Sequence, residues 1–243
     1  MLKVKHLEIH VAHACNLACE SCSHYSDHGH KGIVPIGEAD RWMSQWSGRI
    51  SLGTFSLVGG EPTIHPDLTG FVRLARRHWP GAYLRLVTNG FFLHKHPELP
   101  LALQGDSKAH LFLSIHHRSP EYLEKIKSNY RLLRCSLTRT VPRRSWEKCV
   151  AKRCPQLFEA KLWKCSPLAY LGMQDAKYGL AAKWRPYLAY RPLEPGCTDA
   201  ELAEFFAREE EPFCAMCPAE PERFRLPLPL RRMAVPAREG ADH

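Results

Sequence analysis

The segment LEIHVAHACNLACESC, residues 7–22, joins a strand-like run to three closely spaced cysteines. Leu7 to Val11 is read as a buried strand, and Cys15, Cys19 and Cys22 follow it with the spacing C-x3-C-x2-C. Three thiolates on one loop can wrap a soft metal centre. A closed tetrahedral site or a fully protein-ligated iron-sulfur cluster needs four ligands, so one position stays open. The spacing therefore predicts a centre that reserves a place for a small molecule, either catalytic zinc or a 4Fe-4S cluster.

The bulk composition narrows the class of protein. The chain has 243 residues, which is enough for one sizeable core, with or without a small appendage. Its formal net charge of +9 suits an anionic ligand, an acidic protein partner or nucleic acid. Basic residues are dense only from Arg131 to Arg144, and they are not interleaved with aromatic residues as in a single-strand binding groove. Nucleic acid is therefore not the favoured partner.

Cysteine usage and the N-terminal segment bear on the compartment. The chain has ten cysteines, and its first residues, MLKVKHLEIHVAHAC, are too often interrupted by charged residues and histidines to form the apolar part of a signal peptide. A secreted disulfide scaffold would also be shorter, and no apolar run is long enough to cross a bilayer. We expect a reducing, cytoplasmic compartment, no membrane contact, and thiols that hold metal or remain reduced.

Strand-like and helix-like segments alternate through the first half of the chain. Residues 68, 71, 72 and 75 are apolar and form one helical face, bounded by Pro66-Asp67 and Pro80-Gly81. Alternation at this pace predicts an α/β fold built from βαβ units with a parallel sheet. The expected strands are Leu7–Val11, Thr54–Val58, Tyr83–Thr88 and Ala109–His117, and further helices are expected over Glu38–Ser47 and Glu121–Leu133.

Three motifs fall at the carboxyl ends of these expected strands, where parallel sheets place their ligand sites. CNLACESC follows the first strand, GGEP (Gly59 to Pro62) the second and TNG (Thr88 to Gly90) the third. Two glycines let a ligand approach the backbone closely, Glu61 supplies a carboxylate, and Pro62 fixes the turn. Together, C-x3-C-x2-C after one strand and GGEP after the next resemble the radical S-adenosylmethionine (SAM) enzymes, over residues 7–117.

The resemblance implies a cofactor, a fold and a set of site residues. In that family the motif cysteines hold a 4Fe-4S cluster whose fourth iron is chelated by SAM, which is cleaved to a radical that abstracts a substrate hydrogen. The family fold is a partial βα barrel of six units, whereas four are counted here, so a shortened barrel is expected. The residues implied are Cys15, Cys19 and Cys22 for the cluster, Gly59, Gly60 and Glu61 for the SAM amino group, and Thr88, Asn89 and Ser114 for its carboxylate or ribose.

The second half is rich in Cys, Pro and aromatic residues and shows no clear βα rhythm. Phe158 to Cys165 looks like an arm of a hairpin, and Thr198 to Arg208 like a helix whose Thr198 and Glu201 form a capping box. We expect a core domain over residues 1–144, a small Cys-rich domain over 145–226 and a Pro-rich tail over 227–243.

A second cysteine group resembles the auxiliary-cluster hairpin of twitch and SPASM domains. In that pattern a glycine stands where this chain has Ala160, and the ligands implied are Cys149, Cys165, Cys214 and Cys217, with Cys154 as a rival for the place of Cys149. Four cysteines ending in C-x2-C also suit a structural zinc, which stays open as an alternative.

The favoured function is a radical SAM enzyme that acts on a polar small molecule, such as an aminosugar or aminocyclitol, by oxidation, dehydration or epimerisation. Alternatives are a peptide-modifying maturase and a non-catalytic iron-sulfur or zinc protein. Cys154 and Cys197 are candidates to donate a hydrogen atom to a substrate radical, and the basic surface suits an acidic electron donor such as flavodoxin. His24, His28 and His30 are read mainly as solvated loop residues.

Overall fold

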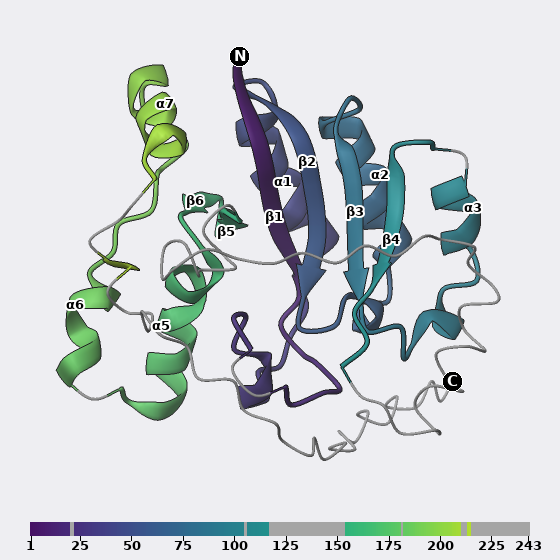
Figure 1. The fold of residues 1–243 in the computed structure, drawn as a ribbon, viewed down its shortest axis with the longest axis horizontal. Helices are drawn as coiled ribbons and strands as arrows, with labels where there is room; N and C mark the ends of the chain where they lie inside the picture. The colour runs from purple at the N-terminus through teal and green to yellow at the C-terminus, as the bar shows by residue number, and fades with distance from the viewer. Residues whose placement is uncertain (20–21, 105, 117–153, 181, 210–212, 215–243) are drawn as a thin grey trace, which may run out of the picture.

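The computed structural model describes residues 1–19, 22–104, 106–116, 154–180, 182–209 and 213–214. Six strands form one sheet in the order β4-β3-β2-β1-β5-β6 (Figure 1). Its neighbours pair in parallel except β5 and β6, which form an antiparallel hairpin. The strands are β1 Leu2–Ala12, β2 Ile50–Gly59, β3 Tyr83–Thr88, β4 Ala109–Leu113, β5 Gln156–Phe158 and β6 Lys161–Trp163.

Helices α1 and α2 cover one face of this sheet (Figure 1). Alternate strand residues on that face, such as Leu7, Ile9 and Phe55, are apolar. They are fully buried in one core with helical residues such as Trp46 and Phe71. Helix α2 begins after Asp67, whose side chain accepts a hydrogen bond from Gly70 N. The helices are α1 Ile36–Ser47, α2 Leu68–His78, α3 Leu99–Gln104, α5 Ser166–Tyr178, α6 Arg185–Leu188 and α7 Asp199–Ala207, with short 3-10 turns at Ser26–His28, Pro62–Ile64, Leu93–Lys95 and Ala182–Trp184.

The other face of the sheet carries a row of polar residues. The register aligns one inward residue from each of five strands in a single row: Gln156, Glu8, Ser56, Arg85 and His110. Within this row Arg85 Nη2 lies 3.0 Å from Glu8 Oε1, Arg85 Nε donates to Ser56 Oγ at 3.0 Å, and Gln156 Nε2 donates to Glu8 Oε2 at 2.8 Å. The concave side of a βα barrel is usually filled by branched apolar side chains, so a hydrogen-bonded polar layer distinguishes this sheet.

The expected α/β fold is confirmed: the sheet is mostly parallel and consistent with a partial βα barrel. The capping box of Thr198 and Glu201 at α7 is also confirmed. Strand β4 ends at Leu113, earlier than expected. The expected helix over 121–133, the boundary near residue 145 and the tail over 227–243 lie outside the described residues.

In the second half, the pairing of the hairpin with the core sheet and the helices α5 and α6 were not predicted. The hairpin β5–β6 joins the core sheet, because β5 pairs in parallel with β1 through Glu8 with Gln156 and Ile9 with Leu157. Helix α5 was missed because its first six residues, 166–171, are all buried, so its sequence carries no alternation of an apolar and a polar face.

Candidate active site

The three motifs meet at the carboxyl edge of the sheet, where the arrowheads of β1, β2 and β3 point in Figure 1. Two backbone hydrogen bonds join the GGEP turn to the cysteine loop: Gly60 N donates to Ala12 O at 2.8 Å, and Glu61 N donates to Ala14 O at 2.9 Å. The expected convergence of these motifs is therefore present in the fold.

The close approach of the two loops accounts for both glycines. Gly59 has a φ of 148°, a conformation that L side chains rarely adopt. A Cβ on Gly60 would stand 2.6 Å from Ala14 C and 2.7 Å from His13 O, and nearer still to Ala14 O. The backbone of the cysteine loop thus occupies the space that a side chain would need.

Glu61 connects the second motif to the third. Its side chain is 1% exposed, and its carboxylate accepts hydrogen bonds from Thr63 N at 3.0 Å, Thr63 Oγ1, Thr88 Oγ1 and Asn89 N at 2.7 Å. Burial raises the pKa of Glu61, and the bonds from Thr63, Thr88 and Asn89 oppose that rise. The carboxylate therefore fixes the GGEP turn against the end of β3.

The third motif also contacts the cysteine loop. Asn89 Nδ2 donates to Asn16 Oδ1 at 2.8 Å, and Asn89 Oδ1 accepts from Phe91 N at 3.0 Å. Ser114 N donates to Thr88 O at 2.8 Å, so the end of β4 joins the same edge. The structure thus brings together Gly59, Gly60, Glu61, Thr88, Asn89 and Ser114 beside the cysteines.

The thiols of Cys15, Cys19 and Cys22 have the chemistry of ligands for a metal cluster. Cys15 is 8% exposed, and Cys19 and Cys22 are half-buried. Burial raises the pKa of the Cys15 thiol to about 12 and that of Cys19 to about 11, and the neighbouring motif thiols contribute to both rises. Such thiolates need a cation beside them, which iron supplies. Leu17 N also donates to Cys15 Sγ at 3.4 Å, so the donor set fits an iron-sulfur cluster.

A cluster of three histidines, His10, His13 and His24, lies beside this loop and was not predicted. His10 Nε2 lies 2.5 Å from His24 Nδ1, and His10 Nδ1 lies 3.4 Å from His13 Nδ1. The His10 ring stacks on Tyr170 of α5 with centroids 3.9 Å apart. Burial lowers the pKa of His10 well below its usual value and that of His13 to about 4. The signal was available, since period-two alternation puts His6, Glu8 and His10 on one face of β1.

The expectation of solvated histidines is corrected at two positions. His24 is half-buried against His10, and burial lowers its pKa. His30 is 8% exposed, whereas His28 is exposed as expected. The chain turns back after η1 (Ser26–His28), and the side chains of α5 cover this part of the loop, with Lys177 Nζ donating to Gly29 O at 3.1 Å.

The second cysteine group is described only in part. Cys154, Cys165 and Cys214 are among the described residues, whereas Cys149 and Cys217 lie outside them. The hairpin turn has Glu159 at φ 51° and Ala160 at φ 62°, which is the left-handed geometry of a two-residue hairpin turn. This conformation explains why the resembling pattern has glycine at the position of Ala160.

The two candidate hydrogen-atom donors lie elsewhere on the sheet. Cys197 Sγ accepts from Arg49 Nη1 at 3.5 Å, and Arg49 directly precedes β2, so Cys197 lies at the edge opposite the GGEP turn. Cys154 stands two residues before Gln156, the β5 partner of Glu8, and so lies beside the middle of β1. The structure does not bring either thiol to the edge that carries Cys15.

The family described as the Radical SAM superfamily matches residues 9–134, just over half of the chain. The chain therefore belongs to the radical SAM superfamily, whose members bind SAM at a 4Fe-4S cluster.

Two of the curated relatives each match less than half of the chain. A protein named PqqA peptide cyclase from Ruegeria pomeroyi is 31% identical over 119 residues, which are 48% of this chain and 30% of that protein. A GTP 3',8-cyclase from Campylobacter fetus subsp. fetus is 28% identical over 99 residues, 38% of this chain and 29% of that protein. The match thus spans less than a third of the length of either relative.

Among solved structures, BtrN in complex with AdoMet and 2-DOIA is 13% identical with a TM-score of 0.49, over 89% of this chain and 86% of that one. SuiB of Streptococcus suis bound to S-adenosylmethionine is 16% identical with a TM-score of 0.44, over 72% of this chain and 47% of that one. In the described part of the chain, no helix has both the length and the apolar character needed to cross a membrane.

Proposed function

We propose that the protein binds a 4Fe-4S cluster through Cys15, Cys19 and Cys22 and cleaves SAM there to abstract a hydrogen atom from a substrate. The observation that carries this proposal is the hydrogen-bonded junction of the cysteine loop with the GGEP turn and the end of β3. When bound, the cluster and SAM supply a one-electron cleavage that no side chain can perform.

The chain's own residues hold and orient these groups. The backbone of Gly59 and Gly60 approaches the cysteine loop because neither residue has a side chain. Glu61 and Asn89 keep that backbone rigid through buried hydrogen bonds. Thr88, Asn89 and Ser114 belong to the same edge of the sheet, which supports the proposal that this edge contacts the carboxylate or ribose of SAM. Rigid support of this kind is what positions a cofactor to within a fraction of an ångström.

The substrate we propose is a polar small molecule such as an aminosugar or aminocyclitol. The row formed by Glu8, Ser56, Arg85 and Gln156 lines the inner face of the sheet with donors and acceptors of both charges. Glu8, Ser56 and Gln156 are buried and hydrogen-bonded within the row, so the row supports a polar substrate through the polar character of this face rather than through direct contacts.

A peptide substrate is the second candidate, because one relative at 31% identity is named a peptide cyclase. A non-catalytic iron-sulfur protein is the third. An auxiliary 4Fe-4S cluster at Cys149 or Cys154, Cys165, Cys214 and Cys217, and an acidic electron donor such as flavodoxin, complete the proposal. The basic net charge of +9 supports the acidic partner, and turnover with flavodoxin should then fall steeply with salt.

The first experiment measures 5′-deoxyadenosine after anaerobic reconstitution with iron and sulfide, in the presence of SAM and dithionite. The full chain should form it, and Cys15→Ala should not. Intact clusters without any 5′-deoxyadenosine would support the non-catalytic alternative. Aminocyclitols and peptides, added in turn, should differ in how far they raise its rate above the substrate-free rate, which separates the first two candidates.

Iron analysis tests the auxiliary cluster separately. Two clusters give about eight irons per chain, and Cys165→Ala should leave about four. If Cys165→Ala leaves the iron content unchanged, the second group does not hold an iron-sulfur cluster.

A further inference from the structure

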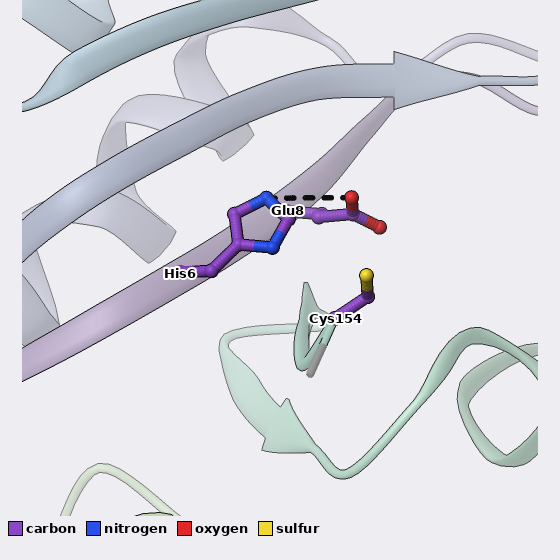
Figure 2. A group of neighbouring side chains, drawn as sticks. All are labelled: His6, Glu8 and Cys154. Carbon is purple, nitrogen blue, oxygen red and sulfur yellow. Dashed lines mark ion pairs between the residues drawn. The ribbon is translucent and has the colours of Figure 1, made fainter. Parts of the chain in front are cut away.

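Three potential metal ligands gather on the inner face of the sheet, away from the cysteine loop. Figure 2 shows His6 and Glu8 projecting from β1 toward Cys154, which precedes β5. One ligand atom from each residue lies within 4.8 Å of those of the other two. His6 and Glu8 are two residues apart on a strand and so share a face. Cys154 reaches them because Gln156 pairs with Glu8 in parallel.

The separations suit a tetrahedral ion. His6 Nε2 lies 3.4 Å from Glu8 Oε1, and two N or O ligands at about 2.0–2.1 Å from zinc are about 3.3–3.4 Å apart in a tetrahedron. A sulfur ligand at about 2.3 Å stands about 3.6 Å from such neighbours. The ligand atoms lie within 4.8 Å of one another, so the Cys154 thiol needs an approach of at most about 1.2 Å, which side-chain rotation provides.

The carboxylate of Glu8 is already oriented as a ligand would be. Arg85 Nη2 and Gln156 Nε2 hold its two oxygens at 3.0 and 2.8 Å, and Tyr170 OH fixes Gln156 by donating to its Oε1 at 3.1 Å. Metal-binding side chains are commonly supported by such a second layer of hydrogen bonds. Metal binding at His6 Nε2 would replace its 2.7 Å hydrogen bond with Ser56 Oγ, which keeps Arg85 as a donor.

We propose that His6, Glu8 and Cys154 bind a divalent ion of the zinc class, with a fourth position for water. One nitrogen, one oxygen and one sulfur ligand suit zinc and disfavour magnesium or calcium, which take oxygen. The site is distinct from the cluster site, since six residues of strand, roughly 20 Å, separate His6 from Ala12 at the end of β1. The ion would lock the hairpin β5–β6 onto β1, which in the described part of the chain pairs with β5 through Glu8 with Gln156 and Ile9 with Leu157.

The site also bears on the auxiliary cluster. A zinc-bound Cys154 is not available as a cluster ligand, so Cys149 takes that place in the proposed second cluster. The sequence left open a second possibility, a structural zinc bound by the four cysteines of the second group. A zinc ion at that site would have four sulfur ligands. The two assignments therefore predict different sulfur counts at zinc.

The test is zinc binding by the full, reconstituted chain. One equivalent of zinc is added anaerobically, the protein is desalted, and retained zinc is measured together with X-ray absorption at the zinc edge, which is blind to iron. We expect about one zinc per chain with one sulfur at about 2.3 Å and nitrogen or oxygen ligands at about 2.0–2.1 Å. Absence of retained zinc, or three to four sulfur ligands, would overturn the proposal.

Variants assign the ligands. His6→Gln and Cys154→Ser should each lower retained zinc at least fivefold, whereas Cys197→Ser, which alters a thiol at the far edge of the sheet, should retain it. Iron content near that of the parent shows that each variant is folded at the cluster site. Retention of zinc by Cys154→Ser would also reject the assignment.

Discussion

Replacing Gly60 by alanine tests the junction on which the proposed active site depends. The new Cβ would stand 2.6 Å from Ala14 C, whereas carbon atoms normally approach to about 3.5–4.0 Å. The cysteine loop must then recede by about 1 Å. That shift breaks the bonds from Gly60 N to Ala12 O and from Glu61 N to Ala14 O. Two lost hydrogen bonds at about 0.5–1.5 kcal/mol each, with about 1–3 kcal/mol of overpacking, predict a loss of about 2–6 kcal/mol.

The assay is the free energy of unfolding in urea, measured anaerobically on the cluster-free chain, followed by iron retention after reconstitution. Ala14 adjoins Cys15, so the variant should also lose most of the iron bound at the first cluster. Gly48→Ala is the matched control, because its Cβ would meet nothing within 4 Å and its backbone is right-handed helical. If Gly60→Ala unfolds within about 0.5 kcal/mol of the parent chain and retains its iron, the close junction of the two loops is wrong.

Three further predictions concern the same elements. Ala160→Gly should stabilise the fold by about 1 kcal/mol, since Ala160 has a φ of 62°. The control Ala39→Gly, at a buried position inside α1, should destabilise the fold by at least about 1 kcal/mol. Equal effects of the two substitutions on the free energy of unfolding in urea would contradict this. Thr88→Val should cost about 1–3 kcal/mol by removing a hydrogen bond to buried Glu61, and Thr88→Ser should restore stability. Burial keeps His10 neutral in the folded chain, with its pKa well below 6.5. Only the unfolded chain therefore binds a proton at this imidazole, so the free energy of unfolding falls as the pH drops below about 6.5. His10→Phe should reduce the slope of the free energy of unfolding against pH by up to about 1.4 kcal/mol per pH unit.

Local patterns predicted the first half of the chain well. The hydrophobic pattern of the sequence predicted strands β1, β2 and β3 and helices α1 and α2. The pattern is clear in the two helices because each has one buried and one exposed side. The sequence also predicted the hairpin, although the two turn residues with left-handed backbone conformation are Glu159 and Ala160, neither of which is glycine. Helix α5 was not, since burial of its whole first turn leaves no contrast between its faces.

The sequence by itself determined the class of the protein, because the spacing of Cys15, Cys19 and Cys22 and the GGEP turn are local chemical patterns fixed by adjacent residues. Only the tertiary structure decided which distant residues meet. It joined Glu61 to Thr88 and Asn89, and it placed β5 beside β1, so that Cys154 faces His6 and Glu8. Such contacts depend on strand order and register, which are set by packing of the whole sheet and leave no mark in any single segment.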